Sequence, residues 1–246
     1  MARPTNQVLM MNQDRIYANP QEVEPFEFNR QVVDVFDDMI ERSVPHYREM
    51  VGEIVELAVA AYQLDTWIYD LGCSLGAVLL PIANRLQDYL RGIVGIDQSE
   101  AMLQELAGRC EGLPVELVCD DMAHVEISKA SVVILHLTLQ FIPVDARDNL
   151  IQRIYDGMVD GGLLIVSEKI LSGHDVLDEI YRDRHHAFKR AQGYSDLEIH
   201  QKRQALEDVL VAETKGAHLQ RFKACGFSTC DIWHQHYNFA SFLARR

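Results

Sequence analysis

Several features that define other classes of protein are scarce or missing in this sequence. It has only 23 Lys and Arg residues against 37 Asp and Glu residues, which gives a formal net charge of -14. A protein that binds the phosphates of a nucleic acid needs a basic face, so this balance argues against direct nucleic-acid binding. No apolar run reaches the roughly 18 residues of a membrane span, and the first residues lack the basic-then-apolar pattern of a signal peptide. We therefore expect a cytoplasmic protein with no membrane partner.

The cysteines and histidines do not form a recognisable metal or disulfide framework. The 5 cysteines are odd in number, and no two of them have CxxC spacing, which favours a reducing compartment. No Cys and His pair has zinc-finger spacing. His185 and His186 are adjacent, so they cannot easily face one metal ion from a helix, and no carboxylate follows at the next turn of the same face. We expect no metal.

Hydrophobic periodicity predicts one large domain at 26–246, preceded by a polar arm at 1–25. Such an arm becomes ordered only if it docks on something. Apolar residues at helical spacing predict two helices, at about 27–42 and 46–62. The residues before Pro45 separate them, because the residue before a proline is pushed out of the helical region.

From residue 66 the pattern alternates between strands and helices. Strands are predicted at 66–69, 92–96, 115–119, 131–137 and 163–167, the last after a turn at Gly161-Gly162, and helices at 77–90, 99–110 and 146–158. This order predicts a Rossmann-like α/β fold with a mainly parallel sheet and helices on both faces. Residues 173–223 are predicted to form a helical lid over the strand ends, with Ser195 and Glu198 as a capping box. Two final strands, 228–233 and 238–243, are expected to be antiparallel at one edge.

The segment around Gly72-x-Ser74-x-Gly76 is the most informative in the chain. It follows an apolar strand that ends near Asp70, and glycines there let the backbone turn tightly and approach a ligand. Asp97 ends the next strand, where an acid can hold a ribose diol. The dinucleotide fingerprint needs G-x-G-x-x-G, and Ser74 replaces its second glycine. The pattern instead resembles the acid-x-Gly-x-Gly-x-Gly signature of class I S-adenosylmethionine-dependent enzymes.

Ligand roles can be assigned to the residues of this predicted nucleoside site. Asp97 would accept hydrogen bonds from the ribose hydroxyls, with Gln98 beside it. Asp121 would accept from the adenine amino group, and Met122 would pack on the adenine face. The turn residues Gly72, Cys73 and Ser74 would line the methionine part of the ligand. Asp70 either favours the cationic sulfonium or only stabilises the turn, and both interpretations remain open.

Further segments resemble the carboxy-S-adenosyl-L-methionine synthase family of the methyltransferase superfamily over about 26–243. They are Phe36–Tyr47, Tyr69–Ala77, Leu137–Phe141, Ser167–Lys169 and, most specifically, Phe188–Arg203. The resemblance implies that prephenate loses carbon dioxide and hydroxide to give phenylpyruvate. The methyl group of S-adenosyl-L-methionine loses a proton to that hydroxide, and the resulting ylide captures the carbon dioxide. It also implies a bound carboxy-S-adenosyl-L-methionine, a homodimer and a functional link to a tRNA carboxymethyltransferase acting on wobble uridine.

The resemblance also implies roles for three further residues. Arg203 would pair with the new carboxylate, which a guanidinium fork can bind at two points. Tyr47 matches a further residue of the site. His136 stands where the family has asparagine; imidazole can make one hydrogen bond in either direction and can titrate near neutral pH. Two alternatives remain, namely a methyltransferase on a small acid with His136 as base, and a non-catalytic S-adenosylmethionine-binding partner in a tRNA-modifying assembly.

Overall fold

The structure is a computed structural model that describes residues 12–246. Its centre is a mixed sheet with the strand order β3-β2-β1-β4-β5-β8-β7, and β6 pairs with β5 off this path. The strands are β1 (Trp67–Leu71), β2 (Ile93–Asp97), β3 (Val115–Cys119), β4 (Ala130–His136), β5 (Met158–Leu171), β6 (Glu213–Thr214), β7 (Thr229–His236) and β8 (Phe239–Arg245). Strands β1 to β5 are parallel, and β8 and β7 add an antiparallel edge, as predicted. The strand order reverses between β1 and β4, which is where ligands bind in open α/β sheets.

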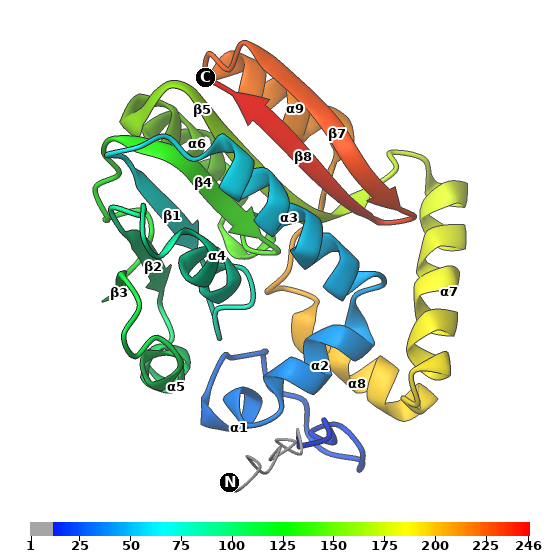
Figure 1. Cartoon of the computed structure of the whole chain (residues 1–246). Helices are drawn as coiled ribbons and strands as arrows, with labels where there is room; N and C mark the ends of the chain where they lie inside the picture. The colour runs from blue at the N-terminus through cyan, green and yellow to red at the C-terminus, as the bar shows by residue number, and fades with distance from the viewer. Residues whose placement is uncertain (1–11) are drawn as a thin grey trace, which may run out of the picture.

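The helices cover both faces of this sheet (Figure 1). They are α1 (Arg30–Val33), α2 (Phe36–Ser43), α3 (Tyr47–Ala61), α4 (Leu79–Leu86), α5 (Glu100–Arg109), α6 (Val144–Gly157), α7 (Asp175–Ala191), α8 (Asp196–Leu206) and α9 (Lys215–Ala224), with a short 3-10 turn, η1 (Leu139–Phe141). None of the helices found in residues 12–246 is long and apolar enough to cross a membrane.

The buried strand β4 shows why the sheet has two cores. Its side chains alternate between the faces, as in any strand. Val132 and Ile134 join the core with α3 and α4, whereas Val133 and Leu135 join the core with α6 and α9. The predicted turn at Gly161-Gly162 lies instead within β5. There the pairing jumps from Ala130 opposite Met158 to Val132 opposite Leu163, so the residues between them bulge out of the ladder.

The single helix predicted at 27–42 is two short helices. Asn29 caps α1 by accepting a hydrogen bond from the backbone N–H of Val32, and Val35 leaves the helical region before α2 begins. Val35 has a φ of -127° and a ψ of 5°, so the helical backbone is interrupted between Asp34 and Phe36. Both helices bury side chains in a third core, which includes Val33 and Met39.

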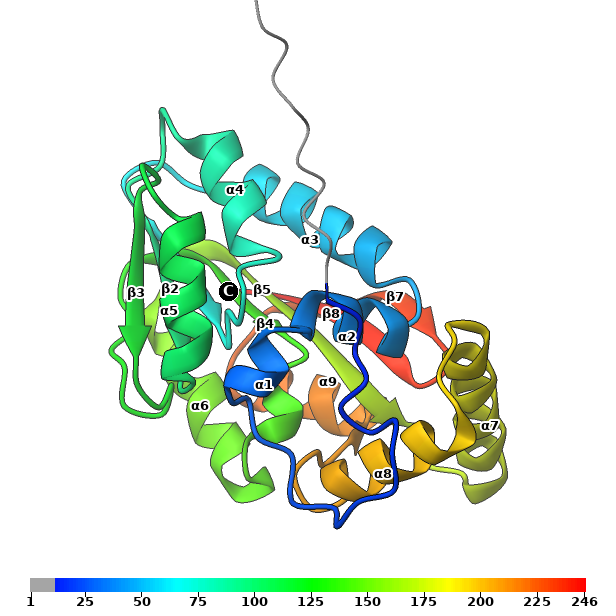
Figure 2. The ribbon, with the colours of Figure 1, turned by 90° about the horizontal axis from the view of Figure 1, so that it is seen from below.

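The lid is shorter than predicted and consists of α7 and α8. The capping box of Ser195 and Glu198 is present at the start of α8. The rest of the predicted segment belongs to the sheet, since β6 pairs with β5 and α9 contacts α6 and β7. Phe222 of α9 is fully buried in the core with β8, which holds this helix on the sheet face. Figure 2 shows α8 with α1 and α2 over one end of the sheet.

The described part of the predicted arm, residues 12–25, lies against the lid (Figure 2). Gln201 of α8 donates to the backbone oxygens of Tyr17 and Asn19, at 2.9 Å each, and accepts from the backbone N–H of Gln21 at 3.0 Å. Asp14 is 1% exposed and accepts a hydrogen bond from the hydroxyl of Tyr194. The remainder of the predicted arm, 1–11, lies outside the described residues.

Candidate functional site

A cavity of about 560 Å³ opens where β1 to β4 end, beneath α2, the lid and the segment Phe26–Phe28. It lies at the switch point of the strand order, so its position matches the rule for open α/β sheets. All but one of the residues predicted for the site line this cavity: Tyr47, Asp70, Gly72, Cys73, Ser74, Asp97, Gln98, Asp121, Met122 and His136. The exception is Arg203.

The glycine turn after β1 is held in a conformation that favours glycine. Gly72 has a φ of 79°, and a Cβ there would lie 2.4 Å from the Cγ2 and Oγ1 atoms of Thr138. Ser74 also has a positive φ, 47°. Asp97 fixes the turn, because its Oδ2 accepts from the backbone N–H of Ser74 at 2.9 Å and its Oδ1 accepts from that of Ser99 at 2.9 Å. A carboxylate has about four acceptor positions, so Asp97 can still bind two hydroxyls.

Asp70 is buried at the base of the cavity with 3% exposure. Burial, and next the charge of Asp97, raise its pKa to about 7, while the backbone N–H of Leu79 at the start of α4 opposes the shift. A cation beside Asp70 would stabilise its ionised form. The two roles considered for Asp70 are therefore compatible, since the carboxyl faces the cavity and also receives a helix N-terminus.

The end of β3 supplies the residues predicted to face adenine. Asp121 lines the cavity and accepts from the backbone N–H of Ala123 at 2.8 Å. Met122 is 5% exposed and packs into the core beneath the cavity. This side thus offers one carboxylate edge and one apolar face, which suits a flat base with an exocyclic amine.

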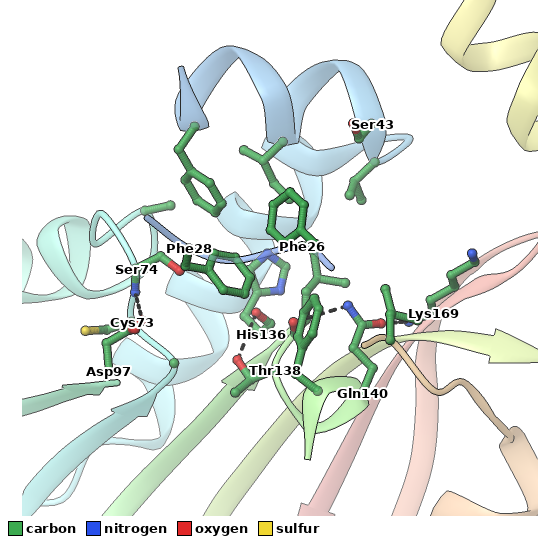
Figure 3. Close-up of a pocket in the computed structure, with 18 of the residues that line it drawn as sticks. Phe26, Phe28, Ser43, Cys73, Ser74, Asp97, His136, Thr138, Gln140 and Lys169 are labelled. Carbon is green, nitrogen blue, oxygen red and sulfur yellow. Dashed lines mark hydrogen bonds between the residues drawn. The ribbon is translucent and has the colours of Figure 1, made fainter. Parts of the chain in front are cut away.

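His136 and Tyr47 form a stacked pair in the cavity wall. Their ring centroids are 5.4 Å apart with an interplanar angle of 28°. Burial lowers the pKa of His136 to about 4 and raises that of Tyr47. Neither ring nitrogen of His136 has a hydrogen-bond partner in residues 12–246. Figure 3 shows His136 between the glycine turn on one side and Gln140 and Lys169 on the other. A neutral imidazole with free hydrogen-bonding positions therefore faces the ligand space.

The far end of the cavity is basic, and none of its three lysines was predicted from the sequence. Lys169 from the end of β5, Lys189 from α7 and Lys202 from α8 line it, together with His185 of α7. The position of Lys169, two residues beyond the strand predicted at 163–167 and near the carboxyl end of β5, was an available signal, because ligands bind at such ends. Lys189 and Lys202 gave no such signal, since helix lysines are usually solvated.

Arg203 lies on an exposed part of α8 and does not line the cavity, whereas its neighbour Lys202 does and is 6% exposed. The charge of Arg203 is still near enough to Lys169 to lower the pKa of that ammonium, after burial. The predicted contact of Arg203 with a carboxylate stays a prediction. Within the described chain, no group of three His, Cys, Asp or Glu side chains is arranged to hold a metal ion.

The chain has the Rossmann-like fold of the class I methyltransferases, with its cavity at the carboxyl ends of the parallel strands. The sequence pattern of the methyltransferase domain matches residues 68–162. Magnesium protoporphyrin IX methyltransferase from Synechocystis PCC 6803, solved with bound SAM, superposes with a TM-score of 0.57 at 18% identity, over 94% of this chain and 88% of its own. An O-methyltransferase family protein from Burkholderia thailandensis gives 0.62 at 16% identity, over 91% and 64%. These likenesses show the fold alone.

Two curated relatives narrow this class to one family. Carboxy-S-adenosyl-L-methionine synthase of Pseudoalteromonas atlantica is 44% identical over 96% of this chain and 99% of its own length. The protein of the same name from Geobacter metallireducens is 46% identical over 95% and 98%. The chain belongs to the carboxy-S-adenosyl-L-methionine synthase family, which confirms the predicted resemblance.

Proposed function

We propose that this protein converts S-adenosyl-L-methionine and prephenate to carboxy-S-adenosyl-L-methionine and phenylpyruvate. One observation carries the proposal: in a member of this family, the Gly72 turn, Asp97 and Asp121 line a single buried cavity. These residues suit the methionine, ribose and adenine parts of the cosubstrate. The cavity continues beyond them, so a second small molecule has room beside the nucleoside.

The chemistry proposed here needs binding and shielding more than proton transfer by a side chain. Prephenate divides into phenylpyruvate, carbon dioxide and hydroxide, and the hydroxide takes a proton from the S-methyl group to give water. The methyl carbon then bonds to carbon dioxide. His136 is a poor base at neutral pH because burial lowers its pKa to about 4. Phe26, Phe28 and Phe36 line the cavity and exclude water that would reprotonate the carbanion.

Turnover with the two proposed substrates tests this reaction. The protein is incubated with S-adenosyl-L-methionine and prephenate, and the products are identified by mass spectrometry. We expect phenylpyruvate together with a nucleoside heavier than S-adenosyl-L-methionine by one carboxylate. Release of S-adenosylhomocysteine with another acceptor would show a methyltransferase instead, and tight binding without turnover would show a binding partner. The small molecule that co-purifies with the protein should have the mass of the carboxylated nucleoside.

We further propose that the product supplies a tRNA carboxymethyltransferase in the cytoplasm, where the 5 cysteines, all free in the structure, would stay reduced.

We also propose a homodimer. Val176 and Ile180 on α7 are 70% and 47% exposed, which is unusual for large apolar side chains on one lid helix. Sedimentation of Ile180→Glu should show monomers, whereas Leu64→Glu, at a 71% exposed site outside the lid, should sediment as the unmodified chain does. Identical sedimentation of both variants would refute this interface.

A further inference from the structure

The basic end of the cavity is built from three separate parts of the chain. Lys169, Lys189 and Lys202 come from β5, α7 and α8, respectively, and all line the same cavity. In Figure 3 Lys169 lies at the opposite end from Ser74 and Asp97. Three ammonium groups that converge from a strand and two lid helices are unusual, because buried lysines are normally paired.

Carboxylates of the protein neutralise little of this charge. Lys202 lies 3.6 Å from the Oδ2 of Asp14 and donates to the Oγ of Ser43 at 3.0 Å. Within residues 12–246, neither Lys169 nor Lys189 forms an ion pair with a carboxylate, and residues 1–11 contain no Asp or Glu. The acids of the cavity, Asp97 among them, are placed at the nucleoside end. The basic end therefore carries excess positive charge in a largely apolar enclosure.

The neighbouring groups fix the lid side of this basic end. Ser43, the last residue of α2, binds Lys202 through its hydroxyl, and its backbone oxygen lies 2.8 Å from the Nε2 of His185. Both lid helices are thus anchored to α2 beside the lysines. Burial, and then the charges of Lys202 and Lys169, lower the pKa of Lys189 to about 7. An anion with two negative charges would reverse that shift and relieve the repulsion.

We infer that Lys169, Lys189 and Lys202 form a subsite for a small dicarboxylate, at the end of the cavity opposite the glycine turn. This inference rests on the proposed function and deepens it, since prephenate carries two carboxylates. A dianion at the lysines would lie next to His136 and face the nucleoside. The strand ends supply the residues for the nucleoside, and the lid helices supply Lys189 and Lys202. The subsite thus gives these two lid lysines a role in the cavity.

Binding measurements separate this subsite from the nucleoside site. Prephenate is titrated by calorimetry at pH 7 into the full chain preloaded with S-adenosylhomocysteine, for Lys169→Met, Lys189→Met and Lys202→Met. Lys223→Met, at an exposed position of α9, is the matched control. We expect each cavity variant to bind prephenate about ten- to hundredfold more weakly, as loss of a charge-assisted contact implies. The cavity variants should keep their affinity for S-adenosylhomocysteine, and the control variant should keep its affinity for both ligands. The same lysine substitutions should weaken binding of phenylpyruvate, which has one carboxylate, less than binding of prephenate.

The outcomes distinguish the subsite from the reaction. Unchanged prephenate affinity in the folded Lys169→Met and Lys189→Met variants would overturn the subsite, even if the reaction is found. Lysine-dependent binding of prephenate without formation of the carboxylated nucleoside would uphold the subsite and refute the proposed reaction. Because Lys202 also contacts Asp14, Lys202→Met is the variant most exposed to a folding defect, and the other two variants decide the matter without it.

Discussion

Replacing Lys189 by methionine tests the buried charge of the lid directly, because the change keeps an unbranched side chain and removes the ammonium. Lys189 is 8% exposed. Burial, followed by the charges of Lys202 and Lys169, lowers its pKa to about 7 from 10.5, with Asp14 acting in the opposite direction. Between these values the unfolded chain binds one more proton than the folded chain. The folded state is therefore penalised most at low pH, and the penalty decreases as pH rises.

The size of this effect follows from the two pKa values of Lys189. The penalty for charging Lys189 in the folded state is about 5 kcal/mol at pH 6 and about 2 kcal/mol at pH 9. Lys189→Met removes the penalty at both values. We therefore expect the variant to be more stable than the unmodified chain at pH 6, and expect this advantage to fall by about 3 kcal/mol between pH 6 and pH 9.

Urea unfolding at pH 6, 7.5 and 9, without ligand, measures the difference. Lys223→Met is the control, since a substitution at this exposed position of α9 should change the free energy of unfolding by no more than about 0.5 kcal/mol. A stability difference for Lys189→Met that is constant from pH 6 to pH 9 would refute the lowered pKa. In that case the Lys189 ammonium would be solvated or paired in the folded protein, and the basic end of the cavity would not carry the excess positive charge on which the dicarboxylate subsite depends.

Three further predictions concern the turn, the arm and the lid. Gly72→Ala should weaken S-adenosylhomocysteine binding about tenfold or more by calorimetry, because its Cβ would meet Thr138, while Gly112→Ala, with the same φ of 79° and open space, should not. Equal binding by both variants would contradict the role of the turn. Asp14→Ala should lower the free energy of unfolding in urea by about 3 kcal/mol, because it leaves a buried ammonium unpaired; a loss below about 1 kcal/mol would contradict this. Arg203→Ala should weaken binding of the carboxylated nucleoside far more than binding of S-adenosyl-L-methionine. Equal losses of affinity for the two ligands, measured by calorimetry, would refute the proposed role of Arg203.

The sheet and the nucleoside half of the site could be predicted from the sequence because both depend on local patterns. A β-branched apolar run such as Val132–Leu135 has few alternatives to a buried strand. The ends of parallel strands meet at one edge, so residues that follow separate strands, such as Asp97 and Asp121, come together without further assumptions. The order of strands and of the residues that follow them was therefore enough to predict this half of the cavity.

The lid half could not be predicted in this way, because it depends on which face of each helix turns inward. Arg203 and Lys202 are neighbours in the sequence, yet a rotation of about 100° per residue points them in different directions. Only Lys202 reaches the cavity of this chain, and it is Asp14 of the arm, far away in sequence, that accompanies it there. A charged helix with weak amphipathic character does not reveal its inner face until its packing partners are known.

The environment of His136, which replaces the asparagine of the family, indicates whether this side chain can act as a base. A histidine that served as base would need a pKa near neutrality and a partner to orient its ring. Within residues 12–246 His136 has neither, since burial lowers its pKa to about 4 and both ring nitrogens lack a hydrogen-bond partner. A neutral imidazole donates from one nitrogen and accepts at the other, much as an amide does with its two ends. His136 thus offers one donor and one acceptor between the glycine turn and Lys169, and its lowered pKa fits the proposed reaction, in which the second substrate supplies its own base.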